Sequence, residues 1–524
     1  MEKEVLIYDT TLRDGTQGEL VSFSAEEKLR IAKRVAELGI HYIEGGWPGS
    51  NPRDMRFFQL AKNLRLGNSS ITAFGSTRRP GTTPKQDPNL KALLEAGTQT
   101  LTIFGKSWDL HVTEILGISL KENLAMISDS IAYLKSMGKE VFFDAEHFFY
   151  GYKANQEYCL ETIRAALSGG ADSIALCDTN GGSMVGEIKT IVEQVRSLFP
   201  DISLGIHAHN DCGLAVANSL AAIEAGATIV HGTINGYGER CGNADLTAII
   251  PNLILKMGRR CIDHSKLVLL TDVSRYVSDV ANIPPLNERP FVGRSAFAHK
   301  GGVHVSAVVK KPLAYEHIEP GMVGNKRRVL VSDLSGKSNI DYKANEMGIS
   351  LGGNGYGSRE IVEEIKKMED LGYQFDTAEG SLELLIKRTT GQFDEPFSLL
   401  FLRVINEKDR DGQTSSQATI KISVGKEEEI TAAEGNGPVN AIDNALRKAL
   451  QKFYPAVSEM RLVDFKVRVL EGSAGTAAKV RVLIESRDGK DIWNTVGVSE
   501  NIIEASWQAL VDSIYFKLNK ETIR

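Results

Sequence analysis

The sequence predicts an α/β fold: a (β/α)8 TIM barrel, then small connecting subdomains, then a C-terminal α+β domain that contains a ββα repeat. Short β-branched or aromatic runs alternate with longer amphipathic segments from residue 4 to about 256, which is the pattern of successive βα units. Eight units in about 250 residues match the usual size of this barrel. The rhythm then changes twice, so we expect domains at residues 1–275, 276–394 and 395–524.

Eight short runs are the candidate strands of the barrel, and each is followed by a helix candidate. They are Val5–Tyr8, Tyr42–Glu44, Ile71–Phe74, Thr100–Phe104, Val141–Phe143, Ser173–Leu176, Leu204–His207 and Thr228–His231. A doubly wound open sheet is the alternative arrangement of βα units. It is disfavoured because no Gly-x-Gly-x-x-Gly motif follows the first strand.

The first helix shows how the helices are recognised. Ser24 and Glu27 have the spacing of a capping box, and Gly39 follows the last apolar position. Between them an apolar stripe runs along one helix face, made of Leu29, Ile31, Ala32, Val35 and Leu38. Similar endings at Gly97, Gly138 and Gly226 close later helices in the same way.

The C-terminal domain has a different period. From about residue 395 we expect two strands, a helix that opens at Gly437-Pro438, strands near 463–470, 478–485 and 491–498, and a final helix from about Asn501. The segments Thr431–Gly435 and Thr495–Ser499 lead into the two helices in similar ways. A repeat of this size is typical of a dimerisation or ligand-sensing module, and a plain packing domain is the alternative.

Composition limits the kinds of partner. The chain carries 61 basic and 67 acidic residues, with no long basic run, so neither nucleic acid nor an anionic membrane surface is expected. No stretch approaches the roughly 18 uninterrupted apolar residues of a membrane span, and the start lacks the segments of a signal peptide. We therefore expect a cytoplasmic protein that acts on a small molecule.

Two histidines near the end of the seventh strand point to a metal. Because side chains alternate along a strand, His207 and His209 face the same way, about 7 Å apart, and can share one ion. The alternative is that both merely pack or meet solvent. The first strand leads into Asp9–Gly15, which brings carboxylates and Arg13 to the C-terminal mouth where barrel enzymes keep their chemistry. A structural salt bridge is the alternative there.

Three motifs together resemble the Claisen-condensing branch of the DRE-TIM metallolyase superfamily. They are Asp-Thr-Thr-Leu-Arg-Asp-Gly-Thr-Gln from Asp9, His-x-His-Asn-Asp from His207, and Gly-Glu-Arg-x-Gly-Asn-Ala from Gly238. The resemblance implies a divalent metal held by Asp14, His207, His209 and Asn243. Such oxygen and nitrogen ligands suit Mn²⁺, Mg²⁺, Zn²⁺ or Co²⁺, and spacing does not choose among them.

The same resemblance assigns roles to other residues. It implies that Arg13 meets the ketone oxygen of a keto acid, that Glu146 is the catalytic carboxylate, and that Thr179 holds the keto-acid carboxylate. Glu44 completes the Asp, Arg, Glu triplet of the superfamily and has a supporting role, or simply pairs with Arg13. His304 lies in a segment that reaches a partner subunit's active site in this family, which makes it a second acid/base candidate; an ordinary surface histidine is the alternative.

Four segments resemble one group of citramalate synthases. They are Trp47–Pro52, Phe104–His111, Asp144–Phe149 and Asp333–Asn339. This resemblance implies condensation of acetyl-CoA, the co-substrate, with pyruvate to give (R)-citramalate on the threonine-independent route to isoleucine. It also implies a homodimer with isoleucine as feedback effector. Phe74 and Phe104, near the ends of strands three and four, are the residues that we expect to narrow the substrate pocket to a methyl group.

Four other functions remain open at this stage. Isopropylmalate synthase is the first, although Leu334–Lys337 stands where that enzyme has His-Ser-Gly-Arg. Homocitrate synthase is the second, because Arg78 and Arg79 could meet a distal carboxylate. A metal-dependent acyl-CoA lyase is the third, but some 250 residues follow the barrel here. A non-catalytic amino-acid sensor is the fourth, and it would not need an intact site.

Overall fold

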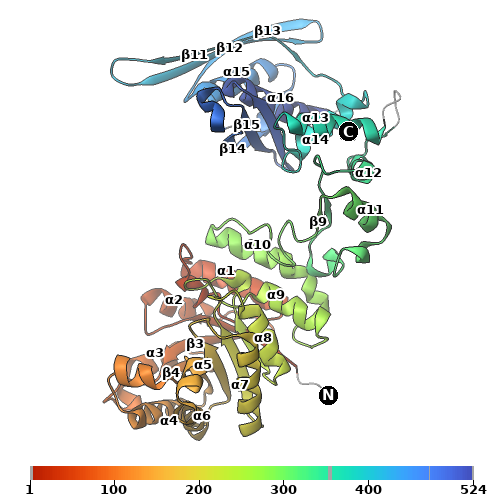
Figure 1. Ribbon diagram of the computed structural model, residues 1–524. Coiled ribbons are helices and arrows are strands. Elements are labelled where there is room, and N and C mark those ends of the chain that lie inside the picture. The colour runs from red at the N-terminus through yellow and green to blue at the C-terminus, as the bar shows by residue number, and fades with distance from the viewer. Residues whose placement is uncertain (1–3, 352–356, 471, 522–524) are drawn as a thin grey trace. The chain divides into compact units, whose positions relative to one another are not determined.

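The computed structural model describes residues 4–351, 357–470 and 472–521, and its first part is a closed eight-stranded barrel (Figure 1). The strands pair in parallel in chain order, and β1 pairs with β8 to close the ring. They are β1 (Leu6–Asp9), β2 (Tyr42–Gly46), β3 (Ser70–Ser76), β4 (Thr100–Lys106), β5 (Glu140–Glu146), β6 (Ser173–Asp178), β7 (Ser203–Ala208) and β8 (Ile229–Gly232). The predicted barrel is therefore confirmed.

Helices connect the strands and surround them (Figure 1). They are α1 (Ala25–Leu38), α2 (Pro52–Ala61), α3 (Pro88–Glu95), α4 (Leu120–Ser136), α5 (Phe148–Ala154), α6 (Gln156–Gly169), α7 (Val185–Leu198) and α8 (Ala215–Glu224), followed by α9 (Leu246–Pro251) and α10 (Leu270–Ala281). Helix α1 begins with the predicted capping box between Ser24 and Glu27. It ends at Gly39, whose φ of 97° lies in the left-handed region that favours glycine.

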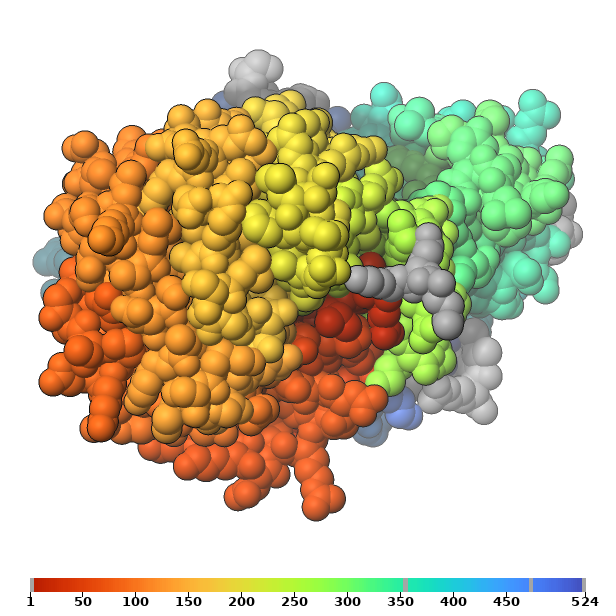
Figure 2. Space-filling model, turned by 90° about the horizontal axis from the view of Figure 1, so that it is seen from below, coloured from red at the N-terminus to blue at the C-terminus, as the bar shows by residue number. Residues whose placement is uncertain are grey.

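The barrel interior is filled, not hollow. Tyr8, Phe142 and Ile229 form a small buried cluster inside the ring, separate from the large core between strands and helices. In the view from below, the dark red start of the chain lies between orange-red and yellow-green segments, as the pairing of β1 with β2 and β8 requires (Figure 2). The interior above this cluster is polar, which leaves the C-terminal mouth for chemistry.

The described residues divide into two compact units, one reaching to Phe297 together with Ile318–Lys326, the other holding Ala298–His317 and the chain from Arg327. The second unit begins with β9 (Ala298–His299), α11 (Gly302–Lys310), β10 (Arg328–Val329), α12 (Lys337–Glu346), α13 (Ser358–Asp370) and α14 (Glu379–Thr389). Helix α14 contributes to two hydrophobic cores, Leu382 to one and Leu384 to the other. The division at residues 275 and 394 stays a prediction.

The C-terminal part contains two three-stranded antiparallel sheets, each followed by a helix. The elements are β11 (Ser398–Lys408), β12 (Thr414–Val424), β13 (Glu427–Gly435) and α15 (Pro438–Leu450), then β14 (Arg461–Val469), β15 (Val480–Arg487), β16 (Ile492–Ser499) and α16 (Ile502–Glu521). The repeat is therefore βββα, and the predicted ββα unit was one strand short. Only Gly425 and Lys426 separate β12 from β13, and β13 opens with three glutamates, which have low strand propensity.

The internal repeat itself is confirmed by matching contacts in its two halves. Thr431 of β13 donates its hydroxyl to the carbonyl of Ala445 in α15, at 2.8 Å. Thr495 of β16 donates to Ala509 in α16 at 2.7 Å, across the same separation in sequence. Each half therefore attaches its helix to its third strand by an equivalent hydrogen bond.

No helix among the described residues is long and apolar enough to cross a membrane.

Candidate active site

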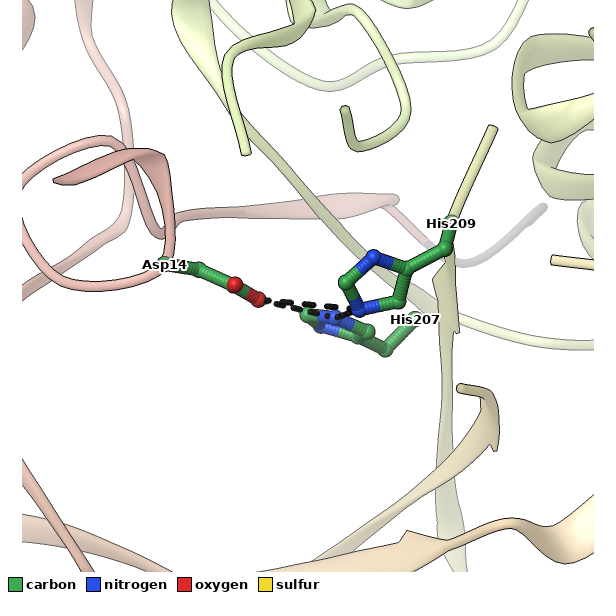
Figure 3. Close-up of side chains that lie close together, drawn as sticks. All are labelled: Asp14, His207 and His209. Atoms are coloured by element: carbon green, nitrogen blue, oxygen red, sulfur yellow. Dashed lines mark hydrogen bonds and ion pairs between the residues drawn. The ribbon is translucent and has the colours of Figure 1, made fainter. Parts of the chain in front are cut away.

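Asp14, His207 and His209 meet at the C-terminal mouth of the barrel (Figure 3). Asp14 follows β1, His207 lies in β7, and His209 comes just after β7, so both imidazoles point toward the carboxylate. The Nε2 atom of His207 lies 3.1 Å from Asp14 Oδ2 and 3.4 Å from Nε2 of His209. Nε2 of His209 is 4.0 Å from the same carboxylate oxygen. The predicted neighbours are thus together.

The charge states of Asp14 and His209 suit a metal ion. Although burial opposes ionisation, Arg13 and His207 hold the pKa of Asp14 well below its usual range. Burial and the neighbouring His207 lower the pKa of His209 to about 4, so its imidazole is neutral at neutral pH. Burial opposes protonation of His207, but the Asp14 carboxylate raises the pKa of His207. Asp14 and His209 are thus in the states that cation coordination requires, and binding of a cation would release the proton from a protonated His207.

Asn243 is paired through its backbone with one of these histidines. Its backbone forms a β-bridge with His209, and its amide nitrogen donates to the carbonyl of Tyr237 at 3.2 Å. Its Oδ1 is buried and has no hydrogen-bond partner among the described residues. Since buried polar atoms are nearly always satisfied, this oxygen fits a ligand that the protein atoms do not supply. The four predicted metal ligands therefore fit a divalent ion.

Arg13 is fixed by a buried network that starts below it. Its Nε donates to Glu44 at 2.6 Å, and its guanidinium lies 3.7 Å from the Phe74 ring centre. The Tyr8 hydroxyl donates to the other Glu44 oxygen at 2.7 Å. The hydroxyls of Thr72 and Thr102 lie 2.8 and 2.7 Å from the Tyr8 hydroxyl. Glu44 therefore pairs with Arg13, as one of the two interpretations expects, and orients it.

Three aromatic rings form a wall beside Arg13. Phe74 and Phe104 are stacked with centroids 5.5 Å apart. Trp47 meets both edge-on, at 5.7 and 5.5 Å, and its indole nitrogen donates to Asn89 at 2.7 Å. We call Trp47, Phe74 and Phe104 the aromatic wall. Side chains so interlocked leave little freedom to adapt to a larger group.

Glu146 ends β5 and forms an ion pair with Lys106, which ends β4. Its other oxygen lies 3.8 Å from Nε2 of His147. The hydroxyl of Thr179 accepts a hydrogen bond from the backbone of His147 at 2.8 Å, which ties the ends of β5 and β6 together. Glu146, which the resemblance assigns as the base, and Thr179, which it assigns to binding the keto-acid carboxylate, therefore both lie next to His147.

Two residues at the site, Asp144 and His231, were not predicted from the sequence. Asp144 and His231 are buried inside the barrel with Asp144 Oδ1 and His231 Nδ1 4.0 Å apart, and burial raises the pKa of Asp144 to about 7. Together with His207 they form a second group of possible ligands. Asp144 could have been found, because it shares a strand face with Glu146. His231 faces the interior beside Tyr8, at a ring distance of 4.1 Å.

Two arrangements bear on the open questions. His304 belongs to the second compact unit, is exposed, and stacks on Tyr315 at a ring distance of 4.3 Å, so its predicted role stays a prediction. Arg78 forms ion pairs with Glu122 and Asp129 at 2.8 and 3.1 Å. Its guanidinium is thereby occupied, which weakens the argument for a dicarboxylate substrate.

Comparisons with known proteins identify the family of this chain. Three family models match consecutive parts of the chain: HMGL-like over residues 4–277, homocitrate synthase post-HMGL domain-like over 291–373, and the LeuA allosteric (dimerisation) domain over 376–518. The resemblance to the Claisen-condensing branch of the DRE-TIM metallolyase superfamily is thereby confirmed.

Similar proteins extend over the whole length. Proteins named (R)-citramalate synthase match at 55% identity over 522 residues in Aquifex aeolicus, covering 99% of each chain, and at 57% over 517 residues in Geobacter sulfurreducens, covering 98% of each. A 2-isopropylmalate synthase of Methanocaldococcus jannaschii is 30% identical over 512 residues, 97% of this chain and 94% of that one. The chain belongs to the HMGL-like family and, within it, to the group of full-length proteins named (R)-citramalate synthase.

Proposed function

We propose that this protein is a (R)-citramalate synthase, which condenses the acetyl group of acetyl-CoA with pyruvate and releases citramalate and CoA. The observation that carries the proposal is the joint presence of the Asp14, His207 and His209 cluster, the Glu146 carboxylate and the aromatic wall at one barrel mouth. Similarity to citramalate synthases over nearly the whole chain supports it.

The barrel residues have distinct roles in this reaction. Asp14, His207, His209 and Asn243 would hold the divalent ion, and when bound it would supply Lewis-acid chemistry at the ketone. Arg13, fixed by Glu44, stabilises the negative charge that develops on the ketone oxygen when the new carbon–carbon bond forms. Thr179 binds the keto-acid carboxylate through its hydroxyl.

Glu146 removes a proton from the acetyl methyl group. A carboxylate acts in this way when it lies within hydrogen-bond reach of the acidic proton. One of its oxygens is held by Lys106, and the other is left to accept the proton. His304, supplied by the second compact unit of a partner subunit, completes the proposal as a further acid or base. We also propose a cytoplasmic homodimer that uses Mn²⁺, Mg²⁺, Zn²⁺ or Co²⁺.

The aromatic wall sets the preference for pyruvate. Phe104→Ala is expected to raise kcat/KM for a branched keto acid relative to pyruvate about tenfold or more, because one or more methylenes gain space and each is worth ~1–3 kcal/mol. Phe104 is chosen because Phe74 also carries the contact with Arg13. Thiol release from acetyl-CoA, measured with pyruvate, 2-oxobutyrate and 2-oxoisovalerate, tests this. A wild-type preference for 2-oxoisovalerate would contradict the proposed substrate.

The C-terminal unit provides feedback control by isoleucine. A groove of about 600 Å³ runs along α15 and the start of β14. Its lining includes the polar side chains of Asn440 and Asn444 and the apolar side chains of Leu462 and Phe465. We place the carboxylate of the amino acid near Gly435–Pro438, where backbone donors at the start of α15 hold it.

Isoleucine is expected to inhibit the full-length protein, while leucine and valine inhibit it less. A two-state coupling of ~1–3 kcal/mol corresponds to a 5- to 150-fold change in affinity. Hydrogen exchange followed by mass spectrometry should show slower exchange near the start of α15 when isoleucine is added. Protection confined to barrel peptides would place the effector on the barrel, and equal inhibition by all three amino acids would argue against a specific site.

A further inference from the structure

We propose that Lys106 is a catalytic residue whose ammonium group donates a hydrogen bond to the thioester oxygen of acetyl-CoA as Glu146 removes the methyl proton. The inference rests on the proposed function, because it assigns a second group to the enolisation step of that reaction. It arises from two segments of the sequence, Phe104–His111 and Asp144–Phe149, which lie at the ends of neighbouring strands.

The parallel pairing of β4 and β5 brings these segments together. Lys106 and Glu146 are register partners and the last residues of their strands, and their side chains form an ion pair. Lys106 and Phe104 are two residues apart, so both point toward the barrel interior, and the ammonium lies 5.5 Å from the Phe104 ring centre. The cation therefore stands between the base and the aromatic wall.

The ion pair between Lys106 and Glu146 is partly exposed, as it must be if a substrate is to contact it. The side chains of Lys106 and Glu146 are 18% and 22% exposed. By contrast, Lys28 and Asp54 form a pair beneath the surface in which Lys28 is 2% exposed and also donates to the carbonyl of Gly45. That second pair is enclosed by protein and serves packing, whereas an ammonium with three donors at the barrel mouth retains capacity for a substrate oxygen.

The imidazoles near Glu146 are not the cationic hydrogen-bond donor that we assign to Lys106. His147 follows Glu146 with a left-handed backbone, at φ 60°, and its ring stacks on His111 at 3.8 Å. Burial, together with the neighbouring His111 imidazole, lowers the pKa of His147 to about 3, so His147 is neutral near pH 7. A left-handed conformation in a non-glycine residue is costly and clusters at functional sites. The cationic donor beside Glu146 is therefore Lys106.

The step is balanced in atoms and charge. The methyl C–H bond of acetyl-CoA breaks, its proton goes to Glu146, and its electron pair becomes the new C=C bond while the thioester oxygen takes the negative charge. The ammonium thus keeps an anion beside it throughout, first the carboxylate and then the enolate oxygen. The enolate carbon next attacks the ketone of pyruvate. A donor aimed at charge that appears in the transition state is typically worth 10²–10³ in rate.

Lys106→Met tests the proposal, since methionine keeps the length of the side chain without its charge. We expect kcat/KM for acetyl-CoA to fall by about 100-fold or more, with pyruvate and metal binding by calorimetry unchanged. Lys106→Arg should recover part of the rate. Trideuteroacetyl-CoA should show a full-size primary isotope effect in Lys106→Met, because C–H cleavage is the step that has been slowed.

Lys135→Met is the matched control, because Lys135 also pairs with a carboxylate, Asp172 at 2.7 Å, but on the outside of the barrel. It should behave as wild type. A wild-type rate in Lys106→Met, or a slow rate with an isotope effect near unity and weakened pyruvate binding, would overturn the catalytic role and leave only a structural ion pair. Absence of thiol release in the wild type would instead reject the proposed function itself.

Discussion

His209→Ala is expected to abolish measurable condensation and to weaken metal binding by more than the ~10–100-fold that follows from loss of a second-shell partner. The variant removes one imidazole from a cluster whose ligand atoms lie 3.1 to 4.0 Å apart. The fold should persist, because the backbone bridge between His209 and Asn243 does not involve the side chain.

Metal content after dialysis and calorimetric titration with Mn²⁺ give a readout that is independent of turnover. His264→Ala is the control, since His264 is exposed and lies outside the cluster. His207→Ala should repeat the result for His209→Ala. Wild-type metal affinity together with full activity in His209→Ala would end the hypothesis of a metal centre at this mouth.

Glu146→Gln is expected to lower turnover by about 10²–10⁴-fold, the range that general-base catalysis contributes. The amide keeps the size of the carboxylate but does not accept a proton at neutral pH. Pyruvate and metal binding should persist, because Glu146 is paired with Lys106 and is not part of the Asp14, His207 and His209 cluster.

Exchange of acetyl-CoA methyl protons with deuterated solvent, followed by NMR, isolates the step in question. Glu157→Gln, on the exposed side of α6, controls for loss of a carboxylate elsewhere on the barrel. Methyl exchange at the wild-type rate in Glu146→Gln would exclude Glu146 as the base and direct attention to another group at the barrel mouth.

The barrel could be predicted because its strands and helices carry local signals. Each strand is a short β-branched or aromatic run, and α1 begins and ends where Ser24 and Gly39 indicate. The His207 and His209 pair was readable from strand alternation, and Asp14 from the position of its motif after the first strand. The C-terminal repeat was recognised from Thr431 and Thr495, although one strand of its first half was missed.

Contacts that depend on strands far apart in sequence were not readable. The pairing of Lys106 with Glu146 needs the register of β4 against β5, which no local pattern reports. The network from Tyr8 to Glu44, Thr72 and Thr102 joins four strands. His231 is a lone histidine in an apolar run, a pattern that more often marks a core position than a site.

The most direct test of the proposed function is the stoichiometry of one reaction in the full-length, metal-loaded protein. Acetyl-CoA and pyruvate should together release one CoA thiol for each pyruvate consumed, with (R)-citramalate as the product by chiral chromatography. Acetyl-CoA alone should release none. Thiol release without pyruvate, or a product built on a larger keto acid in preference to pyruvate, would contradict the proposal.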